Sequence, residues 1–243
     1  MKRRPVQIAA GVAALVLLAL GGTALAGDQT STAASKPTRL AAATMIVEVD
    51  ATAGDAGAQF FLDGEPWRSM TISGPNGRTL LTINAEGRLK GWGLTELFSE
   101  TNEPPFDVVP LEKFKKRFPE GKYTFVGTTI EGEKVVGKAR LSHDIPEGPE
   151  ITSPADGATV ARTNVVARWM APAEPPGIDI VGYRVIVTRE DPLRVYSVDL
   201  KASARSVPIP SEFLESGTEY ELEIQAIEAS VNQTFTTTTF LVR

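Results

Sequence analysis

The chain has 243 residues, a formal net charge of −5, no cysteine and one histidine. These counts exclude disulfide-bonded scaffolds, thiolate metal sites, cysteine nucleophiles and sites that require two histidines. The acidic balance also argues against nucleic-acid binding, because an acidic chain repels the phosphate backbone.

The first 26 residues have the features of an export signal. Three basic residues follow Met1, an apolar run extends from Val6 to Leu20, and Ala24 and Ala26 match a signal-peptidase site. This order predicts a signal peptide of bacterial type over 1–26. The alternative is an uncleaved anchor, since residues 6–26 are long enough to cross a bilayer. Either form predicts an exported protein of the periplasm, the cell surface or the secreted fraction, with membrane contact only through this segment if it is retained.

Composition divides the rest of the chain. Residues 27–43 are rich in Ala, Ser and Thr, which predicts a flexible linker. Two prolines and a glycine in Ile145–Pro149 predict a short hinge. We therefore expect an N-terminal β-sandwich domain over 44–144 and a second domain over 148–243.

The first of these domains shows strand and turn signals. Alternating side chains over Met45–Asp50 predict a strand. Turn signals at Asp63-Gly64, Pro75–Gly77 and Glu131-Gly132 predict hairpins.

A 36-residue segment, 86–121, separates strands that a compact sandwich joins in a few residues. Within it, Leu94–Glu100 is long enough for two helical turns. Pro110–Phe118 is a better helix, with a first-turn proline, an apolar face and basic residues at its carboxyl end.

The same segment is rich in aromatic residues, among them Trp92, Phe98 and Phe106. One interpretation is that they close one end of the sandwich as a satellite core. The other is a ligand-binding surface, in which Trp92 and an aromatic neighbour offer a flat face to a sugar ring or a peptide.

Two other candidate sites are weaker. Asp50, Asp55 and Asp63 are calcium candidates, but they lack the spacing of the known calcium loop, and Asp is common in turns. Ser142 and His143 are adjacent on an expected strand and therefore point to opposite faces, which argues against a serine triad. We expect no metal, no cofactor and no catalytic residue, and we treat the glycosylation pattern at Asn232–Thr234 as incidental.

The second domain resembles a fibronectin type III domain over roughly 148–243. The resemblance rests on Trp169, on Tyr183 after a glycine, and on Leu214 six residues before Tyr220. It implies that Trp169 packs beneath the sheets and that the Tyr220 hydroxyl bonds back to the backbone in a tyrosine corner. Ser216 stands where the family usually has proline.

The first domain resembles an immunoglobulin-like sandwich more weakly. Its run Phe118–Tyr123 repeats the order of an apolar residue, a glycine turn and a tyrosine that opens a strand.

The expected fold is therefore all-β, with two tandem antiparallel β-sandwiches and a short helical insertion in the first. The family resemblance implies a non-catalytic binding or spacer protein whose partner is a protein or a glycan. The alternative is a carbohydrate-active hydrolase with its site in 86–121. Binding predicts an exposed Trp92, whereas catalysis predicts two facing carboxylates, one of them desolvated.

Overall fold

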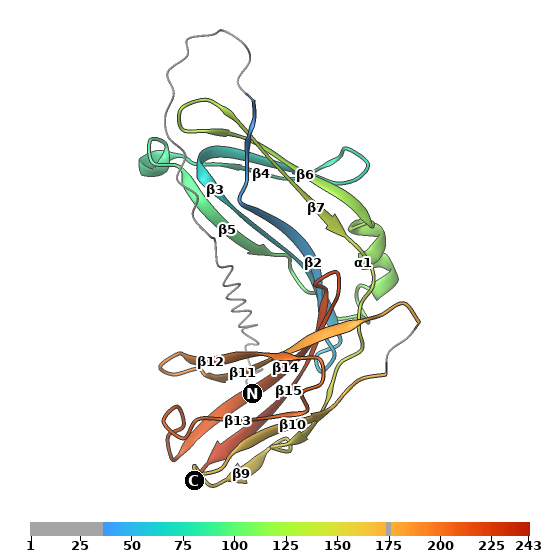
Figure 1. The fold of residues 1–243 in the computed structure, drawn as a ribbon, viewed down its shortest axis with the longest axis vertical. Coiled ribbons are helices and arrows are strands. Elements are labelled where there is room, and N and C mark those ends of the chain that lie inside the picture. Colours follow the sequence, from blue (N-terminus) through green and yellow to red (C-terminus); the bar gives the residue numbers. More distant parts are fainter. Residues whose placement is uncertain (1–35, 174–175) are drawn as a thin grey trace, which may run out of the picture. The chain divides into compact units, whose positions relative to one another are not determined.

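The computed structural model describes residues 36–173 and 176–243, so the expected export signal lies outside the described residues. Lys36–Arg243 clusters as one compact unit. It is built almost entirely of strands, which confirms the all-β sandwich prediction (Figure 1). None of the helices in the described ranges is long and apolar enough to cross a membrane.

The first half has seven strands and two short helices. They are β1 (Thr38–Arg39), β2 (Ala42–Asp50), β3 (Asp55–Ser73), β4 (Thr79–Asn84), η1 (Gly87–Leu89), β5 (Leu94–Glu100), α1 (Leu111–Arg117), β6 (Gly121–Thr129) and β7 (Lys134–Leu141). β1 and the start of β2 fall within the 27–43 segment expected as a linker. They are strands because β1 pairs with β7 and Leu40 packs against the first core.

β3 is the central strand of this half because it pairs with two sets of neighbouring strands. Its first part pairs with β2 and β5, and its second part pairs with β4 and β6. The hairpin expected at Asp63-Gly64 is therefore wrong. β3 continues through these residues, and only its pairing register shifts between Asp63 and Trp67. The turns expected at Pro75–Gly77 and Glu131-Gly132 are confirmed.

The segment 86–121 is only partly helical. α1 confirms the helix expected within Pro110–Phe118. The prediction that Leu94–Glu100 could form two helical turns is wrong, because this stretch is strand β5. The spacing of Leu94 and Leu97 suits a helix face, but backbone pairing with β3 decides the conformation, and both side chains still pack on the core.

The second half has eight strands. They are β8 (Glu150–Ser153), β9 (Ala158–Val160), β10 (Val166–Met170), β11 (Ile180–Arg189), β12 (Arg194–Lys201), β13 (Ser206–Pro208), β14 (Thr218–Glu228) and β15 (Gln233–Val242). β8, β10 and β13 form a small three-stranded sheet. β11, β12, β14 and β15 belong to the large sheet, and a second hydrophobic core lies between the two sheets.

Trp169, Tyr183 and Tyr220, on which the family resemblance rests, lie in that core. The Trp169 and Tyr183 ring centroids lie 5.3 Å apart. The Tyr220 hydroxyl accepts a hydrogen bond from the Glu215 N–H at 2.8 Å and lies 3.4 Å from the Phe213 carbonyl. Leu214 and Tyr220 are both buried. Tyr123 makes a comparable contact in the first half, where its hydroxyl donates to the Pro119 carbonyl at 3.0 Å.

The two halves share one sheet. β15 pairs in parallel with β2, in a register that places Gln233 opposite Glu48 and Phe235 opposite Asp50. This pairing joins the strands of both halves into a 12-stranded sheet. It also brings Gln225 and Gln233 of the second half against the Glu48 side chain of β2.

Candidate functional site

The three aromatic candidates do not form one surface. Trp92 follows η1 and is 80% exposed. Phe98 lies on β5, and Phe106 is half-buried against the first core, with its N–H bonded to the Gly54 carbonyl. Trp92 and Phe106 therefore flank the two ends of β5, which is seven residues long, so they are separated by roughly 20 Å or more.

The three aspartate candidates are also divided. Asp50 and Asp55 pair across the β2–β3 turn, and the Asp50 carboxylate accepts hydrogen bonds from the backbone of that turn. Asp63 pairs with Ala42 at the other end of the same ladder, about 25 Å away along the strand. Asp50 and Asp55 lie beside a larger acidic cluster that the sequence did not reveal.

Ser142 and His143 contact different neighbours. The Ser142 hydroxyl lies 2.6 Å from the Ser230 hydroxyl. His143 Nε2 lies 2.8 Å from the Phe118 carbonyl oxygen. This geometry gives Ser142 no base among its hydrogen-bonding partners in the described chain.

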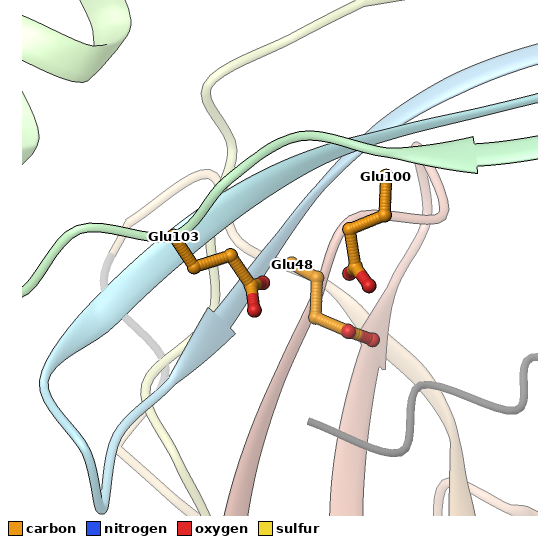
Figure 2. Close-up of side chains that lie close together, drawn as sticks. All are labelled: Glu48, Glu100 and Glu103. Atoms are coloured by element: carbon orange, nitrogen blue, oxygen red, sulfur yellow. The ribbon is translucent and has the colours of Figure 1, made fainter. Parts of the chain in front are cut away.

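The larger cluster consists of Glu48, Glu100 and Glu103. Glu48 comes from β2, Glu100 ends β5, and Glu103 lies in the following loop. Figure 2 shows the three side chains converging, and one carboxylate oxygen of each lies within 4.8 Å of the others. We call these three residues the carboxylate cluster.

Glutamine amides surround the cluster. The Gln59 amide nitrogen donates to Glu48 Oε1 at 2.6 Å and to Glu100 Oε1 at 2.7 Å, so it bridges the two carboxylates. The Gln233 and Gln225 amides both reach Glu48 Oε2 from the second half, Gln225 at 3.5 Å. The cluster is therefore assembled by residues from both halves of the chain.

Gly57 provides the space for Glu103. Gly57 lies opposite Glu48 in the β2–β3 ladder. A Cβ at this position would lie 2.5 Å from Glu103 Oε1 and 3.1 Å from its Cγ. The absence of a side chain thus lets the Glu103 carboxylate lie over the strand, next to Glu48.

Burial and mutual repulsion raise the pKa values of Glu48, Glu103 and the neighbouring Asp55. Burial, followed by the charges of Glu223 and Glu100, raises the pKa of Glu48 to about 9. Burial and the charge of Glu100 raise the pKa of Glu103 to about 7. Burial and the charge of Asp50 raise the pKa of Asp55 to about 6. Such an arrangement can share protons, hold a cation, or provide a carboxylic acid beside a carboxylate.

The sequence contained only an indirect signal for this site. Glu48 alternates with Val47 and Val49 in the strand predicted over Met45–Asp50, a pattern that does not indicate burial of the glutamate, yet Glu48 is 4% exposed. Glu223 and Gln225 likewise alternate with apolar residues on β14, and Gln225 is 3% exposed. The repeated Glu and Gln on these polar faces were visible, but their meeting depends on the β2–β15 pairing.

Comparisons with known proteins give no family for this chain. No family model and no curated protein matches it. Among solved structures, it is similar to an engineered protein at 22% identity with a TM-score of 0.31, covering 43% of this chain and 21% of that protein. It is also similar to a two-domain fibronectin type III segment from chicken tenascin at 13% identity with a TM-score of 0.30, covering 80% of this chain and 95% of that segment.

Proposed function

We propose that this chain is an exported, non-catalytic binding protein that presents its β-sandwich surface to a glycan or a protein. The observation that carries the proposal is Trp92. An indole that is 80% exposed on an ordered turn offers a flat apolar face with a polar N–H, the combination that aromatic recognition of sugars and peptides uses.

The turn that carries Trp92 is docked against the sandwich. The N–H groups of Trp92 and Gly93 both donate to the Leu89 carbonyl. Gly93 has a φ of +72°, and a Cβ there would lie 2.8 Å from Ile130 Cγ2 and 2.9 Å from the Trp67 carbonyl oxygen. The close approach of Gly93 anchors the turn, so the adjacent Trp92 is held outward.

The binding role is tested on glycan and peptide arrays with the full chain. We expect Trp92→Ala to lose at least about tenfold in affinity for any retained ligand, because an exposed aromatic contact of this type contributes on the order of 1–2 kcal/mol or more. Leu193→Ala is the matched control, since Leu193 is also an exposed apolar residue, at 60%, on a different turn. Blank arrays for the unmodified chain would contradict binding and leave a spacer role.

The resemblance to fibronectin type III domains supports the same class of function. The residues that carry it make the contacts that the resemblance implies, with a buried Trp169 and the Tyr220 hydroxyl bonded to the backbone. Domains of this type serve as binding or spacer modules, and the fold alone does not choose the ligand.

Export is tested by the amino terminus of the protein recovered from its source cells. Cleavage after Ala26 predicts a mature chain that begins at Gly27, which intact-mass and N-terminal peptide analysis would detect. A chain recovered with residues 1–26 in the membrane fraction would instead support the uncleaved anchor.

One observation favours the hydrolase alternative. Glu100 and Glu103 belong to 86–121, and Glu103, with a pKa of about 7, could serve as an acid beside Glu100. Against this, Glu48 is buried, and amides bind both Glu48 and Glu100. Screening oligosaccharide substrates with the full chain and with Glu103→Gln tests the alternative: turnover abolished by this replacement would replace the binding proposal.

A further inference from the structure

Positive charge gathers on the outward side of strands β6 and β7. The buried side chains of these strands face the first core, and the residues that alternate with them point outward. Four of the outward residues are exposed cations: Lys122 on β6, and Lys134, Lys138 and Arg140 on β7. We call this side, with its four cations, the basic face. Because strands rise about 3.4 Å per residue, the cations of β7 extend over about 20 Å.

The four cations lack an acidic partner within the described chain. No ion pair between described residues includes any of them. The adjoining part of β3 places Ser69, Thr71 and Ser73 on the same side, opposite outward residues of β6. The acids that are nearest in sequence lie beyond the strand ends: Glu120, Glu131, Glu133 and Asp144. The positive charge of the basic face is therefore uncompensated along its strands.

The stability of the fold does not account for this arrangement. Lys122 lies directly opposite Arg140 in the β6–β7 ladder, and Lys138 is diagonal to Lys122. Like charges directly opposite one another destabilise a sheet. The cations are therefore available to an anion from outside the chain.

Hydroxyl groups lie beside the cations. Thr124 is the next outward residue after Lys122 on β6 and lies opposite Lys138. On β3, the Thr71 hydroxyl lies 3.3 Å from the Thr82 hydroxyl of β4. Hydroxyl groups both donate and accept hydrogen bonds, so this side of the sheet combines positive charge with groups that suit a polar ligand.

We propose that the basic face binds a linear anionic polysaccharide. The carboxylate or sulfate groups of the sugar chain pair with Lys122, Lys138 and Arg140, and its hydroxyl groups bond to Thr124. Arg140 can donate to two oxygens of one acidic group. The basic face is separate from the Trp92 turn, so this inference does not depend on the proposed binding role.

Other negatively charged partners fit the basic face less well. Single-stranded nucleic acids stack their bases on aromatic side chains, whereas Tyr123 and Phe125 of β6 face the core. A peptide or a membrane surface requires exposed apolar anchors. Among the exposed large hydrophobic residues of the described ranges, Val126, at 42%, is the one on these strands. A sugar chain rich in hydroxyl groups requires neither feature.

Binding of defined polysaccharides to the full chain tests the basic face. Dextran sulfate and polygalacturonate are the anionic probes, and uncharged dextran has the same sugar backbone as the first. In isothermal titration at low salt, at least one anionic probe should bind and dextran should not. Added salt should weaken binding, because it screens exposed charges. The Lys138→Gln, Arg140→Gln double variant should bind at least about tenfold less tightly, since it loses two charge-assisted contacts.

Arg168→Gln, Lys201→Gln is the matched control. It also removes two exposed cations, from strands β10 and β12, and leaves the same net charge as the test variant. It should bind the anionic probe like the unmodified chain. Lys122→Gln should bind less tightly although it removes a like-charge contact from the sheet, and thermal unfolding establishes that each variant is folded.

The proposal is overturned if neither anionic probe binds the folded, unmodified chain. It is also overturned if the two double variants lose affinity equally, since binding would then follow net charge rather than the basic face. Tighter binding of polyglutamate or single-stranded DNA than of both polysaccharides would overturn the assigned class of partner.

The Trp92→Ala variant separates this test from that of the proposed function. It should keep its affinity for the anionic probe, and the Lys138→Gln, Arg140→Gln variant should keep any array ligand that depends on Trp92. Loss of the anionic probe in Trp92→Ala would assign its binding to the Trp92 turn and overturn the role of the basic face. Blank arrays alone leave the basic face standing.

Discussion

At the scale of single residues, two non-glycine positions in the described chain adopt a left-handed backbone. Asn164 has a φ of 62° and Val231 a φ of 67°. Asparagine tolerates this conformation, whereas a β-branched side chain is strained in it. Val231 precedes Asn232, which is 1% exposed and bonded to several backbone groups, so the turn is held in place at the cost of that strain.

Replacing Val231 by asparagine should therefore stabilise the protein. We expect Val231→Asn to raise the free energy of unfolding by about 1 kcal/mol, because the backbone keeps its conformation and loses its strain. Urea unfolding of the full chain measures the change. Val181→Asn is the control: Val181 is similarly exposed but lies on strand β11, where asparagine should lower stability. A lower stability for Val231→Asn would contradict the assignment of strain.

At the scale of secondary-structure elements, a tyrosine anchors a long strand in each half. Tyr220 lies near the start of β14 and bonds to the backbone upstream of it. Tyr123 lies near the start of β6 and bonds to Pro119. Burial raises the pKa of Tyr123 from its ordinary 10.0 to about 12. The native chain thus keeps this proton over a pH range in which the unfolded chain releases it.

This pKa shift predicts a loss of stability at alkaline pH. The contribution of Tyr123 is fully present below pH 10 and declines as the pH rises from 10 to 12, because the unfolded state binds fewer protons there. Tyr123→Phe should lose about 1 kcal/mol near neutral pH with the hydrogen bond to Pro119, and its stability should then fall less steeply above pH 10. Urea unfolding of both chains from about pH 7 to pH 11.5 measures the two effects. If the free energy of unfolding fell equally steeply above pH 10 in the unmodified chain and in Tyr123→Phe, the role of burial at Tyr123 would be contradicted.

Elements were predictable from the sequence where local pattern and pairing agree. The strand at Met45–Asp50, the turn at Pro75–Gly77 and helix α1 follow from alternation, turn residues and a single apolar face. Leu94–Glu100 and Asp63-Gly64 were not predictable in this way, because their conformation depends on β3, whose pairing partners are distant in the chain. The local signals there are compatible with more than one structure.

At the scale of the whole molecule, the candidate site was not predictable for the same reason. The strand over Met45–Asp50 was predicted, but the burial of Glu48 was not, because it follows from β15, which pairs with β2 although 185 residues separate Glu48 from Gln233. The all-β class follows from many short alternating runs. The meeting of Glu48 with Gln225 requires the three-dimensional arrangement of both halves.

The pairing of β2 with β15 predicts that the two halves unfold together. Asn232 supports this connection: its Oδ1 accepts a hydrogen bond from the Val47 N–H at 2.8 Å, and its amide nitrogen lies 3.1 Å from the carbonyl oxygens of Ser142 and Asp144. The side chain therefore links the β14–β15 turn to β2 and to the segment between the halves. Its burial in these contacts also makes it a poor glycosylation acceptor.

Asn232→Ala should weaken this coupling. We expect a loss of about 2–4 kcal/mol, because the Val47 N–H and two carbonyl groups lose their partner in a buried setting. Hydrogen exchange followed by mass spectrometry during urea unfolding would report β6 and β11 separately. Their transitions should coincide in the unmodified chain and separate in the variant. Asn76→Ala, which removes an exposed turn contact to the Arg78 N–H, should leave the transitions together. Separate transitions in the unmodified chain would mean that the shared strand pair does not couple the halves.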